Sequence, residues 1–122
     1  MKKTSEEYSL LCDYYGSLIS ERQREVFELY YEENLSLAEI AEGLGVSRQA
    51  VHIALGKAVV ELEAFEKKLG LITRHTAYEK TMNEVEAKFN AILKDRERVA
   101  VLDPDLVRDL KRIKRLVKEL DI

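Results

Sequence analysis

The fold of this chain depends most on the stretch LAEIAEGLGVSRQAVHIAL (residues 37–55). Its apolar residues recur at helical spacing in both halves, so each half predicts a short helix with one buried face. Ser36 stands before the first helix with Glu39 three residues on, which is the pattern of a capping box, and Ser47 is placed to cap the second helix. Gly45, between them, allows the left-handed backbone conformation that ends a helix. We therefore predict two helices that cross at a steep angle, a helix-turn-helix.

The composition favours helices throughout the chain. Hydrophobic residues make up 46% of the 122 residues, enough for a core, while five glycines and one proline leave little room for the turns of a β-sheet protein. A stripe of Tyr8, Leu11, Tyr15 and Leu18 predicts one helix over residues 6–19. A second helix is predicted over residues 20–34, with Ser20 and Gln23 as its capping box and Asn34 as a left-handed C-cap. The predicted fold class is all-α: a helix-turn-helix bundle over residues 1–70, then a C-terminal helical extension over 71–122.

The sequence of the C-terminal extension predicts a long helix, a break in the pattern over residues 94–103 and then a basic amphipathic helix. No proline or polar cluster follows Gly70, so we expect the helix before it to continue through it, straight or slightly bent. Apolar residues at 82–92 and 106–120 lie three and four residues apart, which makes the extension a candidate for dimerisation or partner binding. Asp103 and Pro104 are suited to begin the last helix as N-cap and first helical residue.

The outer face of this last helix is strongly basic. It carries six cations: Arg108, Lys111, Arg112, Lys114, Arg115 and Lys118. Such a face can hold RNA phosphates or an acidic protein by charge, or it can be an ordinary solvated surface.

The charge is unevenly divided between the two parts. Residues 1–70 hold 8 Lys/Arg against 13 Asp/Glu, a net charge of −5, and residues 71–122 hold 12 against 10, a net charge of +2. An autonomous DNA-binding domain is expected to carry a strong positive balance, which neither part has. The acidic balance of the first part disfavours DNA as its partner.

The second helix of the helix-turn-helix carries the candidate binding residues. Arg48, Gln49 and His52 are the outward positions nearest its start, where a recognition helix meets its partner, and arginine and glutamine suit guanine and adenine in a major groove. Ile53, beside them, suits a methyl or protein contact better than a base edge. The candidate set also includes Ser47 ahead of the helix and the neighbouring cations that could clamp phosphates: Arg22, Arg24 and Lys57. The alternative is that the motif is a packing scaffold or a protein-binding surface.

No pattern in the sequence points to catalysis or to a metal. His52 and His75 lie far apart, without cysteine or carboxylate at ligand spacing around them. The sequence contains no Gly-rich phosphate loop, and neither histidine is placed beside a candidate nucleophile. We expect no catalytic residue, no metal site and no cofactor.

The expected compartment is the cytoplasm. Cys12 is the single cysteine and can form no internal disulfide, which favours a reducing environment. No apolar run approaches the roughly 20 residues needed to cross a bilayer, and the first residues do not resemble a signal peptide. We therefore expect no membrane insertion.

Two family resemblances extend this interpretation. Residues 20–63, SERQREVFELYYEENLSLAEIAEGLGVSRQAVHIALGKAVVELE, resemble region four of bacterial sigma factors, a helix-turn-helix that reads promoter DNA. More of the chain is similar to the YlxM family, through LCDYYGSLISERQREVFELYYEENLSLAEIAE, SRQAV and LEAFEKKLGL, which together span roughly residues 10–71. Only SRQAV, residues 47–51, and its flanks carry over residue by residue. At residues 53–56 the chain has IALG where the family has polar residues, which weakens a base-reading role.

The YlxM resemblance implies a small, all-helical regulatory protein of the signal recognition particle pathway, which contacts the particle's GTPase, its RNA or both. Our leading hypothesis is therefore a non-enzymatic regulatory binding protein of that pathway. The second hypothesis is a transcriptional regulator that reads DNA with Arg48, Gln49 and His52. The third is a dimeric structural adaptor that uses the apolar stripes of the extension as its seam.

Overall fold

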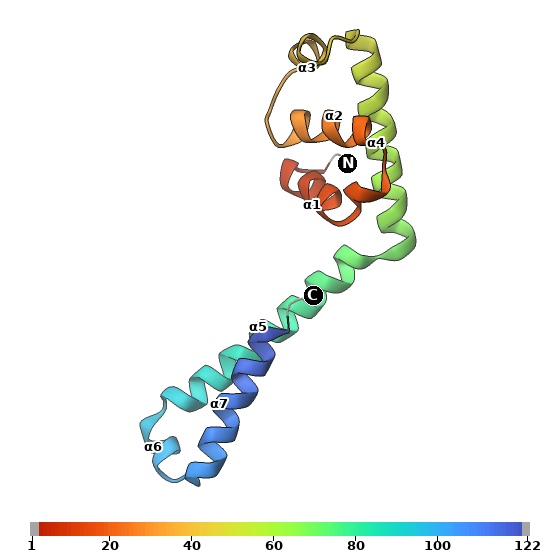
Figure 1. The fold of residues 1–122 in the computed structure, drawn as a ribbon. Coiled ribbons are helices and arrows are strands. Elements are labelled where there is room, and N and C mark those ends of the chain that lie inside the picture. The colour runs from red at the N-terminus through yellow and green to blue at the C-terminus, as the bar shows by residue number, and fades with distance from the viewer. Residues whose placement is uncertain (1–2, 121–122) are drawn as a thin grey trace. The chain divides into compact units, whose positions relative to one another are not determined.

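The computed structural model describes residues 3–120 and confirms the all-α fold class (Figure 1). The described residues contain no strand. They form, in chain order, α1 (Ser5–Tyr15), the short 3-10 helix η1 (Gly16–Leu18), α2 (Glu21–Tyr31), α3 (Leu37–Leu44), α4 (Arg48–Leu69), α5 (Leu71–Lys94), α6 (Arg96–Ala100) and α7 (Pro104–Glu119). The chain divides into two compact units, unit 1 (Met1–Ile72) and unit 2 (Thr73–Ile122).

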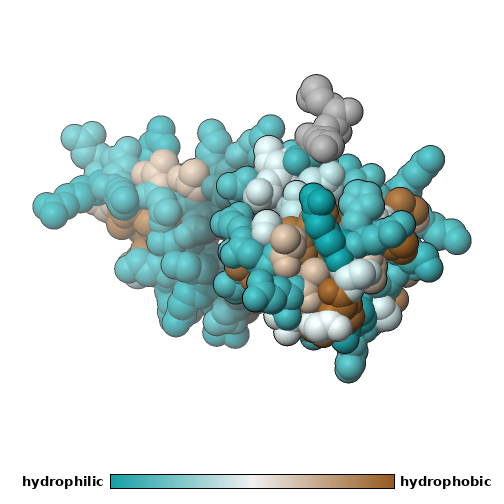
Figure 2. Space-filling model, turned by 90° about the horizontal axis from the view of Figure 1, so that it is seen from above, coloured by the Kyte–Doolittle hydropathy of each residue, from teal (hydrophilic) through white to brown (hydrophobic). Residues whose placement is uncertain are grey.

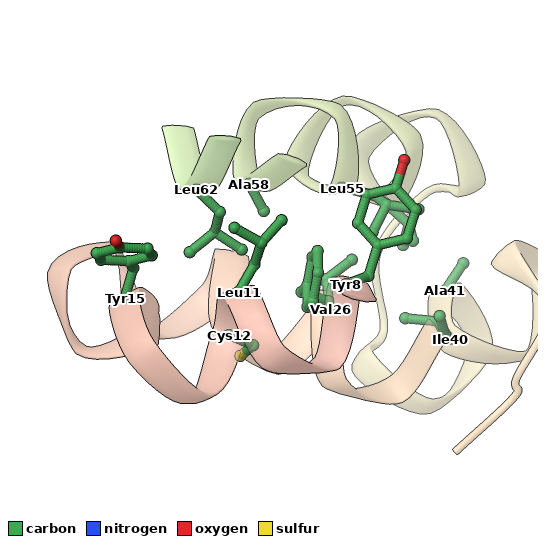
Figure 3. Packing of buried hydrophobic residues seen from close by; sticks show 12 residues of the cluster. Tyr8, Leu11, Cys12, Tyr15, Val26, Ile40, Ala41, Leu55, Ala58 and Leu62 are labelled. Atoms are coloured by element: carbon green, nitrogen blue, oxygen red, sulfur yellow. The ribbon is translucent and has the colours of Figure 1, made fainter. Parts of the chain in front are cut away.

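Unit 1 has a hydrophobic core in which α1, α2 and α3 pack against α4. Figure 3 shows Leu11 and Tyr15 of α1 on the side that faces Ala58 and Leu62 of α4, with Cys12 on the opposite side of α1. The buried side chains come from all four helices: Tyr8, Leu11, Cys12, Tyr15, Val26, Phe27, Ile40, Ala41, Val51, Leu55, Ala58 and Leu62. The long helix α4 therefore forms the side of the core that the other three helices share.

The first helix is shorter than the predicted range 6–19. It ends at Tyr15, and η1 follows it. Because a 3-10 helix turns further per residue than an α-helix, Leu18 leaves the buried stripe on which we expected it and is 56% exposed. A capping box that was not predicted begins α1, since Thr4 Oγ1 accepts a hydrogen bond from the Glu7 amide at 3.2 Å and the Glu7 carboxylate accepts one from the Thr4 amide.

The second helix begins as predicted and ends earlier. Ser20 and Gln23 form the expected capping box, with distances of 3.2 and 3.1 Å between side-chain oxygens and backbone nitrogens. The helix stops at Tyr31 with Glu32 as its C-cap. Asn34 is left-handed as predicted, with φ of 57°, but it lies in the loop after the C-cap.

The expectation of a helix that continues through Gly70 is wrong. Gly70 adopts a left-handed conformation, with φ of 64°, and ends α4 by donating its amide to the Glu66 carbonyl at 2.8 Å. A new helix needs partners for its first amides. The Leu71 amide bonds the Tyr15 hydroxyl at 3.1 Å, and the Ile72 amide bonds Glu66 Oε1 at 3.0 Å. The break is thus stabilised by α1, which is far from Gly70 in the sequence.

Unit 2 contains one helix that the sequence does not predict. Residues 94–103 interrupt the long helix as predicted, but five of them form α6, capped by Asp95, whose Oδ1 accepts the Glu97 and Arg98 amides at 3.2 Å each. The last helix begins as predicted, with Asp103 as its N-cap and proline in its first turn. In Figure 1, α7 runs back along α5.

The apolar stripe predicted over residues 106–120 is divided in the structure. Val107, Leu110 and Val117 are half-buried, whereas a second group is exposed by 43–56%: Leu106, Ile113, Leu116 and Leu120. None of the described residues from 73 to 120 is fully buried. Among residues 3–120, no helix combines the length and apolar character needed to cross a membrane.

Candidate nucleic-acid interface

The helix-turn-helix consists of α3, a three-residue turn and α4. Ser36 and Glu39 form the predicted capping box, with both distances at 3.1 Å, and these bonds to Ser36 hold the pKa of the Glu39 carboxyl below its usual value. Gly45 is left-handed, with φ of 68°, and Val46 donates its amide to the Ala41 carbonyl at 3.1 Å. This pairing of a left-handed glycine with a bond back into the last turn closes α3 and redirects the chain.

Ser47 is the N-cap of α4, as predicted. Its Oγ accepts a hydrogen bond from the Ala50 amide at 3.0 Å. Val51 and Leu55 turn into the core, with 1% and 8% exposure, and Ala54 is half-buried. Burial of this side fixes which residues α4 presents outward.

The outward side of the first α4 turns carries the predicted binding residues. Arg48, Gln49 and His52 are exposed and line one hollow of about 420 Å³ together with Leu37 of α3. Ile53 is 52% exposed and does not line this hollow. Figure 2 looks onto unit 1 from the end where α3 and the start of α4 lie, and its visible surface is mainly hydrophilic with small, separate hydrophobic patches.

Leu37 is a part of this hollow that the sequence does not predict. Its apolar spacing with the rest of α3 assigned it to a buried face, but it is only half-buried. It lies opposite Arg48 and Gln49 because the turn brings the start of α3 close to the start of α4. No local signal in the sequence shows this juxtaposition, since it depends on the crossing of the two helices.

The three cations proposed as phosphate clamps do not line the hollow. Arg24 is held by Glu28, with Nε 2.9 Å from Oε1, and this hydrogen bond raises the pKa of Arg24. Arg22 and Lys57 are exposed and make no salt bridge with any described residue. They remain able to meet a partner that extends beyond the hollow.

The basic face of α7 is the other predicted surface. Arg108 pairs with Asp105 at 3.3 Å. The other five cations of this face make no salt bridge with a carboxylate of residues 3–120: Lys111, Arg112, Lys114, Arg115 and Lys118. Lys114 is half-buried and the rest are exposed.

Few side chains in the described part of the chain are suited to metal binding or to nucleophilic catalysis. Within residues 3–120, no three His, Cys, Asp or Glu side chains gather in a way that could hold a metal ion. Cys12 is 5% exposed, and burial together with the nearby Glu28 carboxylate raises the pKa of its thiol to about 11. A thiol with so high a pKa is a poor nucleophile at neutral pH.

Comparison with known proteins identifies the family. Residues 1–101 match the family UPF0122, described as YlxM / p13 like and as a helix-turn-helix family. The chain is 40% identical to a UPF0122 protein of Thermoanaerobacter sp. (strain X514) over 114 residues, which cover 93% of each chain. It is 49% identical to one of Desulforamulus reducens over 83 residues, 68% of this chain and 71% of the relative. It is 36% identical to one of Clostridium botulinum over 110 residues, 90% of this chain and 95% of the relative. The chain therefore belongs to the UPF0122 family of YlxM / p13-like helix-turn-helix proteins.

Proposed function

We propose that this protein is a non-enzymatic regulatory binding protein whose helix-turn-helix holds a nucleic acid. The observation that carries this proposal is the grouping of Arg48, Gln49 and His52 at one exposed hollow at the start of α4. All three side chains can donate hydrogen bonds, and Arg48 adds a positive charge. The first amides of α4 lie at the same end, where the helix dipole favours an anion.

Within this class we propose the signal recognition particle pathway as the setting, with the particle's RNA, its GTPase or both as partners. Similarity to the YlxM family over most of unit 1 supports this choice. The acidic balance of residues 1–70 supports the GTPase as a partner over a long nucleic-acid duplex, because a non-specific duplex is held mainly by many cations. In this setting, the exposed Ile53 contacts a protein or a nucleotide face rather than a base edge. A cytoplasmic location follows from the same proposal.

The test uses the full-length protein, the purified particle RNA and the purified GTPase at about 150 mM salt. We expect R48A/Q49A to lower affinity for the RNA or for the GTPase by at least tenfold, with the helical signal unchanged. Lys68→Ala is the control, because it removes one charge from the opposite end of the same helix. The proposal would be contradicted if the protein bound neither the RNA nor the GTPase. It would also be contradicted if R48A/Q49A and Lys68→Ala lowered the affinity equally.

A second candidate is a DNA-binding transcriptional regulator. The observation in its favour is that Arg48 and Gln49, the two residue types suited to guanine and adenine, are both exposed at the start of α4. A defined duplex bound much tighter than the non-specific range of roughly 10⁻⁴ to 10⁻⁶ M at about 150 mM salt, and lost in R48A/Q49A, would favour it. Duplex binding only within that non-specific range would exclude this candidate.

A third candidate is a dimeric structural adaptor. The exposed apolar residues of α7 favour it: Leu106, Ile113, Leu116 and Leu120. Light scattering at high micromolar concentration tests this candidate, and a monomer there excludes it.

A further inference from the structure

Unit 2 contains a hollow whose lining is almost entirely cationic. Its volume is about 610 Å³, and it lies between Leu93, near the end of α5, and four cations of α7: Lys111, Lys114, Arg115 and Lys118. No carboxylate of residues 3–120 lines it. Of the hollows described for this chain, it gathers the most positive charge.

The spacing of the four cations places them on one face of α7. They stand at positions i, i+3, i+4 and i+7, which lie above one another on an α-helix. At about 1.5 Å of rise per residue, the row is about 10 Å long. Asp109 is two residues before Lys111 and so points to a different side of the helix, whereas Glu119 directly follows Lys118 and stands four residues after Arg115.

This row makes no ion pair in the described part of the chain. No salt bridge joins any of the four to a carboxylate of residues 3–120, Glu119 included. Like charges at these spacings repel one another and disfavour the helix. Lys114 is nevertheless half-buried and lines the hollow with Leu93. A lysine in such a position can pack its aliphatic stem and keep its ammonium group in water. A row of cations that no described carboxylate pairs, around a concave surface, has the electrostatics of a site for an extended anion.

We propose that this hollow binds the phosphate backbone of a nucleic acid. A strand of a duplex advances about 3.4 Å per phosphate along the axis, so a row of about 10 Å meets about three successive phosphates. Lysine and arginine side chains are sufficient for such backbone contacts, which position a nucleic acid without reading its sequence. An acidic protein segment would also need an apolar anchor, and among residues 3–120 the only aliphatic residue that lines the hollow is Leu93.

This site is separate from the one at the start of α4 and does not depend on the proposed function of that site. Four of its five lining residues belong to α7, which begins at Pro104, after the residues 1–101 that the family model matches. Most of the site therefore lies outside the stretch that the family model matches.

The test compares two double variants of α7 in the full-length protein. K114Q/R115Q removes two charges that line the hollow, and R108Q/R112Q removes two charges from the same helix that do not line it. The probes are a 20-base-pair RNA duplex, a DNA duplex of the same sequence and poly-glutamate, each titrated at several salt concentrations. Circular dichroism establishes that both variants retain the helical content of the parent.

Each phosphate contact contributes about 0.9 to the slope of log affinity against log salt for a duplex. Between 50 and 200 mM salt, we therefore expect the loss of duplex affinity to be about twelvefold smaller for K114Q/R115Q than for the parent, with R108Q/R112Q close to the parent. Equal affinity of the parent for the RNA and DNA duplexes supports recognition of the phosphates that both share. Tighter binding of the RNA duplex identifies RNA as the nucleic acid that the hollow binds.

Three results would overturn the inference. The first is an equal effect of the two α7 variants, which would mean that charge alone and not the hollow matters. The second is tighter binding of poly-glutamate than of either duplex. The third is a nucleic-acid affinity that falls in R48A/Q49A but not in K114Q/R115Q, which would leave the proposed function intact. A nucleic-acid affinity that falls in K114Q/R115Q but not in R48A/Q49A would instead support this site and contradict nucleic-acid binding by the helix-turn-helix.

Discussion

The Tyr15 hydroxyl donates a hydrogen bond to Glu66 Oε1 at 2.6 Å and joins the end of α1 to the last turn of α4. The same hydroxyl accepts the Leu71 amide at 3.1 Å, so one buried oxygen serves both the end of α4 and the start of α5. Burial, and next the bond to Glu66, raise the pKa of Tyr15. This contact makes Gly70 a defined helix boundary within unit 1.

Removal of this hydroxyl should destabilise unit 1. Tyr15→Phe keeps the ring but leaves the part-buried Leu71 amide without its partner, and a donor that loses its partner away from water costs about 1–3 kcal/mol. We expect a loss of about 1–2 kcal/mol in urea unfolding. Hydrogen exchange should show faster exchange at Leu71. Tyr78→Phe is the matched control, since the Tyr78 hydroxyl makes no hydrogen bond with any described residue. Equal effects of the two changes would contradict this role of Tyr15.

Two glycines of unit 1 should respond to alanine with opposite signs. Gly70 has φ of 64°, so Gly70→Ala should destabilise by about 1 kcal/mol. Gly56 lies inside α4, and no atom lies within 4 Å of the position that a Cβ would take there, so Gly56→Ala should stabilise by about 0.5–1 kcal/mol. Thermal unfolding of both variants measures the difference. Stabilisation by Gly70→Ala would mean that α4 does not end at Gly70, and destabilisation by Gly56→Ala would contradict the open space at Gly56.

Substitutions of Ser47 can distinguish its role as the N-cap of α4 from the charge of the binding surface beside it. Ser47→Asp should leave stability within about 0.5 kcal/mol, because aspartate caps helices as well as serine does. Its carboxylate next to Arg48 should lower nucleic-acid affinity about fivefold, the effect of roughly 1 kcal/mol of repulsion at the surface. Ser47→Asn is the uncharged control and should keep both properties. Undiminished affinity in Ser47→Asp would place the nucleic acid away from the start of α4.

The Cys12 thiol should make stability depend on pH in the alkaline range. Its pKa rises from 9.0 to about 11 in the folded chain, so the folded state keeps the proton where the unfolded state loses it. The stabilisation is complete below pH 9 and is lost as the pH rises from 9 through 11. Urea unfolding across this range should show a shallower decline for Cys12→Ala than for the parent. An identical decline would mean that tyrosines such as Tyr31, whose pKa burial raises to about 12, account for all of it.

The candidate site was only partly predictable. Arg48, Gln49 and His52 follow from the helical period once α4 is known to begin after Ser47, and the structure brings them together at one hollow. Leu37 could not be assigned to that hollow, because its place depends on how α3 crosses α4. The cationic row on α7 is visible in the sequence, but the sequence does not show that Leu93 of α5 closes a hollow beside it.

Local sequence is sufficient for those features of the fold that a few neighbouring residues control. The caps at Ser20, Ser36 and Ser47 and the turn at Gly45 are all predicted correctly, because each rests on hydrogen bonds or backbone angles within about four residues. The all-α class follows from the same local signals together with the helical period of apolar residues.

Features that need distant partners depend instead on how the helices pack. Gly70 could end a helix or lie within one, and the local energies differ by only about 1 kcal/mol. The hydroxyl of Tyr15, which is 51 residues from Glu66 and 56 from Leu71, provides the hydrogen bonds that favour the break. The physical reason is that a helix end must satisfy its free amides, and here the group that satisfies the first of them comes from another helix.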